Sequence, residues 1–261
     1  MIVSDLDGTL FNSDQPGYEV SRELIKSIRL FRESGRIFTI ATGRPQSSCT
    51  SVVNQLDLDV PYIACNGALI TDRTGKRYYS HSFSLDNWLP FLEKVRELGA
   101  AVLITHLDKV YYLQMTEAVR RYENKEGIQC HPAGDWLIQG DNPVSKVLLI
   151  GNVSALKIEW ENLNPSIKNF CRYVISEHNY MEVIGSEISK GAALKLLKKH
   201  LGIRDDEVVC IGNQMNDLEL LEEAHIGVAV ANAEAELKTM ADYITAGEFD
   251  RGVLEVINKY R

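Results

Sequence analysis

The hydrophobic positions of the chain alternate between short continuous runs and longer stretches with helical spacing. Residues 36–41 and 62–65 are almost uninterrupted apolar runs, which are typical of strands buried on both faces of a parallel sheet. Between Ser21 and Gly35 the apolar residues instead follow a helical period, so this stretch predicts a helix. A polar loop is expected at residues 11–18. The alternation of strands and helices predicts an α/β fold with a doubly wound, Rossmann-like parallel sheet.

The pattern changes near residue 70, where short strand-like runs follow one another with few intervening residues. Runs at 101–105 and 110–114 predict one hairpin, and runs at 170–176 and 180–184 predict a second. Further strands are expected at 77–83 and 144–150, with helices at 84–98, 117–124 and 155–161. This mixture predicts an inserted α+β domain over residues 81–185.

The first pattern returns after residue 185. Strands are expected at 207–211 and 226–230, with helices within 186–201 and at 218–223, 234–240 and 252–260. We therefore predict a core formed by residues 1–80 and 186–261, which the inserted domain interrupts.

Composition and charge argue against several classes of function. The 261 residues are 45% hydrophobic and carry a net charge of -8, without a cluster of Lys and Arg, so a nucleic-acid partner is not expected. No apolar run is long enough to cross a bilayer, and acidic residues interrupt the first ten positions, so neither a membrane partner nor a signal peptide is expected. The five cysteines are scattered without a CxxC, which favours reduced core residues. We expect a cytoplasmic protein that is monomeric by default.

Polar residues and glycines follow the expected strands of the core. Asp5 and Asp7 are two positions apart, so on an extended chain they point the same way, and their repulsion needs a cation or a proton. Taken alone, the pair is more typical of solvated turn residues. Ligands of parallel α/β sheets, however, bind beyond the carboxyl ends of the strands. Convergence there predicts one site from Asp5 and Asp7, Thr42-Gly43-Arg44, Asn66-Gly67, and Gly212-Asn213 through Asn216-Asp217.

Four of these stretches resemble the motifs of the haloacid dehalogenase (HAD) superfamily. The order of the motifs and the large insert between the second and the third are similar to the Cof-type branch (subfamily IIB), whose cap domain lies at that place. The resemblance covers both ends of the chain but no motif of the insert. In order, the four motifs are Asp5-Leu6-Asp7-Gly8-Thr9-Leu10, Ala41-Thr42-Gly43-Arg44-Pro45, Lys190-Gly191 and Gly212-Asn213-Gln214-Met215-Asn216-Asp217.

The resemblance implies a Mg²⁺-dependent phosphatase that acts on sugar phosphates or similar small phosphorylated metabolites. Asp5 would be the nucleophile that forms an aspartyl-phosphate, and Asp7 would be the general acid and then the general base. Mg²⁺ would be bound by the Asp5 carboxylate, the main-chain oxygen of Asp7 and a residue of the fourth motif, where Asn213 and Asp217 are the candidates.

The remaining residues of the motifs would hold the phosphate and the substrate. A lysine in the first turn of a helix opposes the helix dipole at a cost of ~0.3–1 kcal/mol. Neutralisation of Asp5 and the phosphate therefore explains Lys190 better than a structural role does. The candidates for phosphate or substrate binding are Thr42, Gly43, Arg44, Asn66 and Asn216.

The sequence leaves structural explanations open for several of these residues. Thr42 could be a helix N-cap, Arg44 could face solvent, and Asn66-Gly67 could form a turn after a strand. Asn216 and Asp217 could cap the first turn of a helix.

Asn213 departs from the family pattern, which has aspartate at this position. An amide oxygen can bind Mg²⁺ but brings no charge. Three readings follow: an active phosphatase with Asn213 as a neutral ligand, an active enzyme with weakened Mg²⁺ binding, and an impaired member that binds a phosphorylated metabolite. A phosphomutase of the same fold is a further alternative.

Overall fold

The computed structural model describes residues 1–12, 19–85, 87–134 and 142–261. The loop expected at 11–18 lies mostly outside the described residues. The chain forms two compact units, which are described separately: Met1–Gly43, Cys49–Tyr79 and Ser189–Arg261 make up the first, and Arg44–Ser48 and Ser80–Ile188 make up the second. These limits differ from the predicted ones by one residue before the insert and three after it, and they assign Arg44–Ser48 to the second unit.

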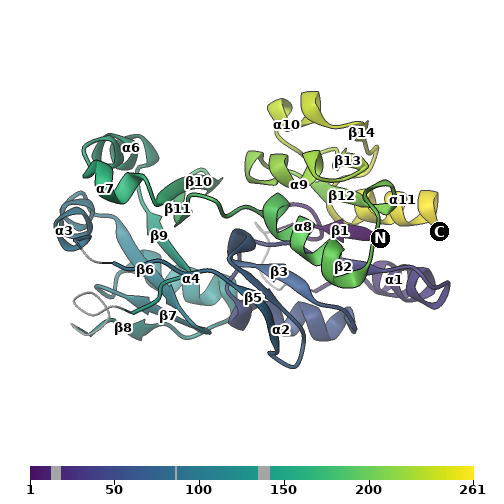
Figure 1. Cartoon of the computed structure of the whole chain (residues 1–261), viewed down its shortest axis with the longest axis horizontal. Helices are drawn as coiled ribbons and strands as arrows, with labels where there is room; N and C mark the ends of the chain where they lie inside the picture. Colours follow the sequence, from purple (N-terminus) through teal and green to yellow (C-terminus); the bar gives the residue numbers. More distant parts are fainter. Residues whose placement is uncertain (13–18, 86, 135–141) are drawn as a thin grey trace. The chain divides into compact units, whose positions relative to one another are not determined.

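A five-stranded parallel sheet forms the centre of the first unit (Figure 1). Ser4 of β1 pairs with Ile40 of β2 on one side and with Ile211 of β12 on the other, and these three strands are buried. Because all three run in the same direction, their carboxyl ends lie at one edge of the sheet. The strands, in spatial order, are β14 (Tyr243–Ile244), β13 (Ile226–Ala229), β12 (Val209–Gly212), β1 (Ile2–Ser4) and β2 (Phe38–Ile40).

The predicted strand at 62–65 has a different neighbour from the one its apolar run suggests. β3 (Tyr62–Ala64) meets the parallel sheet through a single bridge between Ile63 and Ala41. Its ladder partner is the antiparallel β4 (Leu69–Thr71), which is followed by β5 (Arg77–Ser80). Between β3 and β4, Gly67 adopts a φ of 101°, which reverses the chain.

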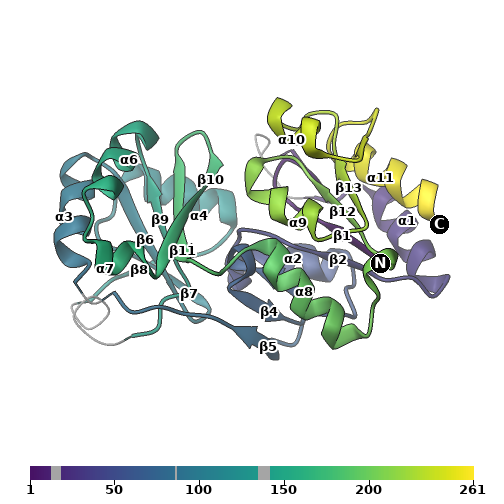
Figure 2. The ribbon, with the colours of Figure 1, turned by 45° about the horizontal axis from the view of Figure 1, so that its top comes forward.

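Helices pack around the first sheet in two evident pairs, α1 with α11 and α8 with α9 (Figure 2). α1 (Arg22–Glu33) begins after Ser21, whose hydroxyl accepts a hydrogen bond from the Leu24 N–H, as its sequence predicts. The other helices are α2 (Gln46–Gln55), α8 (Lys190–Leu201), α9 (Leu218–Glu222), α10 (Ala235–Met240) and α11 (Phe249–Tyr260).

The second unit is built on a six-stranded sheet that is antiparallel except for one parallel pair, β7 with β8. Both predicted hairpins are present, as β6–β7 and β10–β11. The strands, in spatial order, are β10 (Cys171–Glu177), β11 (Tyr180–Gly185), β9 (Lys146–Ile150), β6 (Ala101–His106), β7 (Lys109–Tyr112) and β8 (His131–Pro132).

Helices cover both faces of this second sheet. In β6, Val102 and Ile104 belong to an apolar cluster with α3 (Leu89–Glu97) and α6 (Val153–Glu161), whereas Ala101 and Leu103 pack in a cluster with α4 (Glu117–Glu126). The short α7 (Pro165–Lys168) precedes β10. The predicted fold class, an α/β core with a Rossmann-like parallel sheet and an inserted α+β domain, is confirmed.

Candidate active site

Asp5 lies directly beyond β1, at the edge where the strands of the first unit end. Its main-chain N–H donates to the Ile211 oxygen of β12 (2.9 Å), and the Ala41 N–H beyond β2 donates to the Ser4 oxygen (2.9 Å). Asp5 is buried and Asp7 is half-buried. The pairing therefore fixes Asp5 between the ends of β2 and β12.

A buried lysine joins Asp5 to a second carboxylate. Lys190 is the first residue of α8, where the Ser189 hydroxyl caps the helix by accepting from the Ala192 N–H. The Lys190 Nζ donates to Asp5 Oδ1 (2.7 Å) and to Asp217 Oδ1 (2.6 Å), and its side chain is only 1% exposed. The first, third and fourth sequence motifs thus meet at one ammonium group.

Negative charge is in excess around Lys190. Burial, together with the nearby charge of Asp217, raises the pKa of Asp5 to about 7, although Lys190 acts in the opposite direction. Burial lowers the pKa of Lys190, but the charges of Asp217 and Asp5 outweigh it and leave the pKa above its ordinary value. Two carboxylates share the Lys190 ammonium, and the charge of Asp7 also acts on Asp5, so an additional cation would be stabilised here.

Both oxygens of the Asp217 carboxylate are occupied by protein donors. Oδ1 accepts from Lys190, and Oδ2 accepts from the main-chain N–H groups of Asn213 (2.9 Å) and Gln214 (3.2 Å). Asp217 therefore caps the turn after β12 and at the same time orients Lys190.

The Asn213 side chain faces the loop that carries Asp5 and Asp7. One end of its amide lies 3.2 Å from Asp5 Oδ2, 2.9 Å from the main-chain oxygen of Asp7 and 2.9 Å from Thr9 Oγ1. Neighbouring ligands of octahedral Mg²⁺, each 2.0–2.1 Å from the ion, lie about 2.9 Å apart. With its oxygen at this end, Asn213 therefore has a spacing from Asp5 and Asp7 that fits a Mg²⁺ site.

The possible metal ligands carry little charge. Among the described residues, no three side chains of His, Cys, Asp or Glu are grouped so that they could hold a metal ion. A cation near Asp5 would rely on one carboxylate, the main-chain oxygen of Asp7, the amide of Asn213 and water. Oxygen ligands of this kind suit Mg²⁺, which commonly keeps several waters.

The predicted phosphate-binding residues of the second motif lie beyond β2. Thr42 is fully buried, and its main-chain oxygen accepts from the Asn66 N–H (3.0 Å). A Cβ on Gly67 would lie 2.1 Å from the Ser189 oxygen, so the Asn66-Gly67 turn packs directly against the start of α8. Because α2 begins only at Gln46, the alternative in which Thr42 is its N-cap is wrong. Gly43 follows Thr42 within the first unit.

Arg44 and Asn216 have different surroundings. Arg44 is only 4% exposed and pairs with Glu126 of α4 within the second unit, at 3.7 Å from Nε to Oε2, so the solvent-facing alternative is wrong. Asn216 is half-buried, and its Oδ1 has no hydrogen-bond partner among the described residues.

Three further residues contact predicted site residues or their loops, and the sequence motifs assign none of the three a role. Thr9 belongs to the first motif and approaches Asn213, as described above. Asn232 donates from Nδ2 to the Gly8 oxygen (2.8 Å) and accepts the Phe249 N–H at Oδ1 (2.9 Å), which holds the turn after Asp7 in place. Glu126 is the buried partner of Arg44. The contacts of these three residues join segments far apart in sequence, so no local sequence pattern predicts them.

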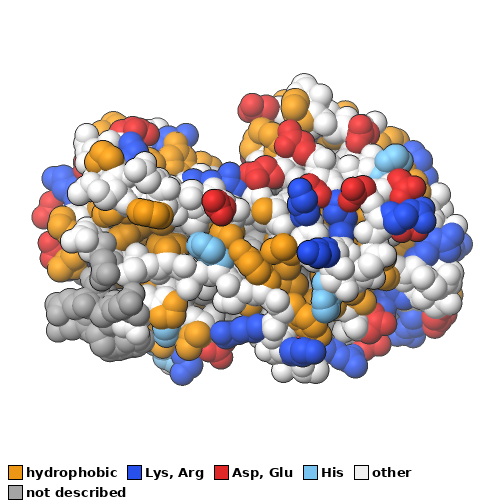
Figure 3. All heavy atoms as spheres, in the orientation of Figure 1, with side chains coloured by type: hydrophobic (Ala, Val, Ile, Leu, Met, Phe, Trp, Pro, Cys, Tyr) orange, Lys and Arg blue, Asp and Glu red, His pale blue; other side chains and the backbone are white. Residues whose placement is uncertain are grey.

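Charged side chains are mixed over the surface seen in Figure 3, where Lys and Arg are interspersed with Asp and Glu rather than gathered in a broad basic patch. Within the part of the chain that the structure describes, no helix is both long enough and apolar enough to cross a membrane.

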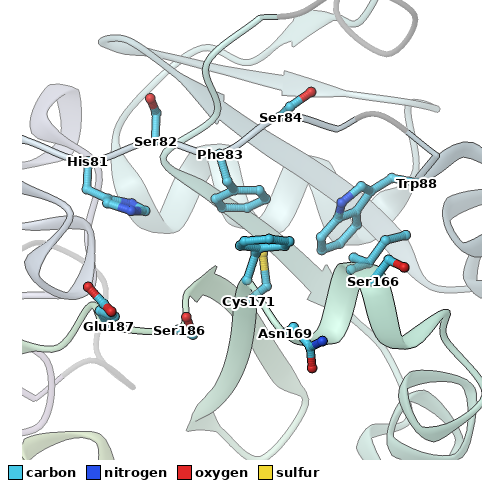
Figure 4. A pocket seen from close by; sticks show the side chains of 12 residues that line it. His81, Ser82, Phe83, Ser84, Trp88, Ser166, Asn169, Cys171, Ser186 and Glu187 are labelled. Carbon is cyan, nitrogen blue, oxygen red and sulfur yellow. The ribbon is translucent and has the colours of Figure 1, made fainter.

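A cavity of about 620 Å³ lies within the second unit. In Figure 4 the rings of Phe83 and Trp88 lie along it, while His81 and Glu187 mark one end. Neither lysine nor arginine occurs among the described residues that line it. Among the described residues that line this cavity, a phosphate group would therefore meet neither lysine nor arginine, in contrast to the surroundings of Lys190.

Comparisons with known proteins identify the family to which the chain belongs. The family model of haloacid dehalogenase-like hydrolases matches residues 2–257. The chain is 26% identical to phosphatase YwpJ of Bacillus subtilis over 98% of each chain. It is also 26% identical to the 5-amino-6-(5-phospho-D-ribitylamino)uracil phosphatase YitU of the same organism, over 100% of this chain and 97% of that protein.

A solved structure shows the same fold. The crystal structure of a haloacid dehalogenase-like hydrolase from Bacteroides thetaiotaomicron superimposes with a TM-score of 0.86 at 26% identity, and covers 100% of this chain and 98% of that one. Because the family model extends over nearly the whole chain, the resemblance seen in the four motifs is confirmed. The chain belongs to the haloacid dehalogenase-like hydrolase family.

Proposed function

We propose that this protein is a Mg²⁺-dependent phosphatase that hydrolyses small phosphate monoesters through a phosphorylated Asp5. The observation that carries the proposal is the buried Lys190, whose Nζ bonds Asp5 at 2.7 Å and Asp217 at 2.6 Å. The buried ammonium holds Asp5 in place and, together with the proposed Mg²⁺, would balance the negative charge that a phosphoryl group brings.

Asp5 and Asp7 have separate tasks in the reaction. A carboxylate oxygen of Asp5 attacks phosphorus, and the bond between phosphorus and the ester oxygen breaks. Asp7, in its protonated form, gives its proton to the departing oxygen. Asp7 then removes a proton from water, whose oxygen attacks the phosphorus of the acyl-phosphate. Inorganic phosphate leaves, and Asp5 is restored as a carboxylate.

The metal ligands of the proposal are the Asp5 carboxylate, the main-chain oxygen of Asp7 and the amide oxygen of Asn213. Bound Mg²⁺ supplies positive charge that offsets the repulsion between the anionic nucleophile and the anionic phosphate. We assign Asp217 to the positioning of Lys190, because protein donors already occupy both of its oxygens.

The remaining candidates would hold the substrate. Thr42 and the Gly43 N–H would bond phosphoryl oxygens together with Lys190, and the Nδ2 groups of Asn66 and Asn216 can donate to the same anion. The second unit would act as the cap that selects the substrate. The relative YitU acts, by its name, on a phosphate carried by a ribityl chain, which supports phosphorylated sugars or sugar alcohols as the substrate class here.

The proposal is tested by incubating the purified protein and Mg²⁺ with a panel of sugar phosphates and an aryl phosphate, and measuring released phosphate. Turnover is expected, and Asp5→Asn should abolish it. Asp59→Asn is the matched control, because the Asp59 side chain is 61% exposed and lies outside the motifs. Activity of Asp5→Asn close to that of the unmodified protein would refute the nucleophile.

A second candidate function is a binding protein for phosphorylated metabolites that does not hydrolyse them. The neutral Asn213 favours it, because the site then lacks one of the charges that hold Mg²⁺. This candidate predicts that the same panel raises the unfolding temperature but releases no phosphate.

A further inference from the structure

The amide of Asn213 can face the first motif with either its nitrogen, which donates hydrogen bonds, or its oxygen, which accepts them. The end that faces the first motif lies 2.9 Å from the Asp7 oxygen and 3.2 Å from Asp5 Oδ2. If this end is the nitrogen, Asn213 donates to Asp5, Asp7 and Thr9 at once. If it is the oxygen, Asn213 accepts from the Thr9 hydroxyl (2.9 Å) and presents its lone pairs beside those of Asp5 and Asp7.

Which end faces the motif depends on whether a cation is present. Three oxygens brought together without a cation repel one another, whereas an NH₂ group between them forms hydrogen bonds. A cation bound among the same atoms reverses the preference, because it attracts the amide oxygen and repels the NH₂ hydrogens. The nitrogen and oxygen of an amide differ little in size, so the exchange requires only a half-turn of the group and no new space.

The packing of the outer end limits other movements of this side chain. A Cβ on Gly8 would lie 2.3 Å from the outer atom of the amide, and Asn213 is only 7% exposed. The amide is thus enclosed between Gly8 on one side and the oxygens of Asp5 and Asp7 on the other. Rotation of the amide about the Cβ–Cγ bond exchanges its nitrogen and oxygen without moving the rest of the residue.

We propose that Asn213 is a metal-responsive amide, which bonds Asp5, Asp7 and Thr9 through its nitrogen in the metal-free protein and turns its oxygen inward when Mg²⁺ binds. This inference rests on the metal site of the proposed function. It adds that the departure from aspartate has a use: the first motif stays ordered without a metal. The corresponding disadvantage is weaker binding, since Mg²⁺ must displace the amide hydrogen bonds and gains no charge from the ligand.

An aspartate at position 213 would behave in the opposite way. An ionised carboxylate carries no hydrogen-bond donor of its own. Without Mg²⁺ it would therefore place a further negative charge next to Asp5. Asn213→Asp should therefore unfold at a lower temperature than the unmodified protein in EDTA. It should bind Mg²⁺ roughly tenfold more tightly, because affinity rises with the charge of the ligands, and Mg²⁺ should raise its unfolding temperature by more.

The experiment compares thermal unfolding and calorimetric Mg²⁺ binding of the unmodified protein, Asn213→Asp and the control Asn54→Asp. Asn54 is exposed in α2, so its substitution adds the same charge far from the motif. We expect Asn54→Asp to match the unmodified protein in both measurements. Equal unfolding temperatures of Asn213→Asp and the unmodified protein in EDTA, with Mg²⁺ binding intact, would overturn the amide proposal alone.

A second measurement does not depend on the variant folding. In ¹⁵N NMR spectra of the unmodified protein, the side-chain NH₂ signals of Asn213 should shift strongly on addition of Mg²⁺, because their acceptors change. Residue-selective labelling with a set of Asn substitutions assigns the signals. Unmoved Asn213 NH₂ signals at saturating Mg²⁺ would refute the half-turn. Failure of both proteins to bind Mg²⁺ would instead overturn the metal site of the proposed function, and the amide proposal with it.

Discussion

Asp217 holds the Lys190 ammonium at 2.6 Å while its other oxygen caps the turn of Asn213 and Gln214. The carboxylate thereby connects the end of β12 to the start of α8. Replacing it with an amide should break one of the two connections, since the NH₂ group of asparagine must face either the ammonium or the two N–H donors.

We expect Asp217→Asn to lower kcat by roughly 10–100-fold and to decrease the free energy of unfolding by about 1–3 kcal/mol. Steady-state kinetics and chemical denaturation measure the two effects. Asp242→Asn is the control, because Asp242 also caps a main-chain N–H, that of Gly227 at 2.8 Å, but lies outside the motifs. If both variants lose the same stability and neither loses activity, Asp217 has only a capping role.

Gly67 should tolerate no side chain. It has a φ of 101°, and an added Cβ would lie 2.1 Å from the Ser189 oxygen. Gly67→Ala should therefore displace the start of α8 and with it Lys190, so both the unfolding temperature and kcat should fall.

Gly35→Ala separates this clash from backbone strain. Gly35 also has a positive φ (83°), but nothing lies within 4 Å of its added Cβ. Its substitution should cost only the strain, about 1–2 kcal/mol, with kcat unchanged. Equal effects of the two substitutions would contradict the close packing of Gly67 on α8.

The ion pair of Arg44 and Glu126 should matter for stability. The two side chains are 3% and 7% exposed, so Glu126→Gln removes a negative charge that faces a buried guanidinium. We expect this change to lower the free energy of unfolding by about 3–5 kcal/mol. Glu117→Gln in the same helix is the control, since its pair with Arg121 is exposed and should contribute only about 0–1 kcal/mol. Similar losses in the two variants would argue against a role for the buried pair.

The cysteines should be unreactive in the native protein. All five are buried, and burial raises the pKa of both Cys130 and Cys171 to about 12. A thiol reagent at pH 8 should label none of them rapidly, but all five after denaturation. Rapid labelling of the native protein would show that one of them is accessible.

The same shifts predict a dependence of stability on pH. Unfolded thiols lose their protons near pH 8.5, whereas Cys130 and Cys171 keep theirs until about pH 12 in the native state. Between these values the native state binds more protons than the unfolded state, so its stability falls as the pH rises. Replacing either cysteine with alanine should reduce this slope, which denaturation at several pH values measures.

The sequence predicts the elements of the fold well where hydrophobic periodicity decides them. Ser21 at the start of α1 and the hairpin of β10 with β11 are examples, because the signals are local. It could not predict that β3 pairs mainly with β4, since a continuous apolar run indicates burial but not the neighbouring strand.

For the site residues, too, the sequence predicts those with a local signal and not those that depend on a distant partner. Lys190 is recognisable because a lysine at the start of a helix opposes the dipole, which calls for a nearby anion. By contrast, the contact of Asn232 with Gly8, and that of Asn213 with the Asp7 oxygen, join opposite ends of the chain. Asparagine has no local signature that reveals such a partner.

The position of β1 between β2 and β12 has a consequence for synthesis of the protein on the ribosome. Asp5 and Asp7 are synthesised before the inserted unit, but β12, which completes the pairing of β1, emerges from the ribosome only after that unit. The described strands of its six-stranded sheet lie between residues 101 and 185, so this sheet can form earlier. The proposed nucleophile is thus synthesised well before Lys190, its partner from α8. A chain that ends within the inserted unit therefore lacks a group that the proposed reaction needs.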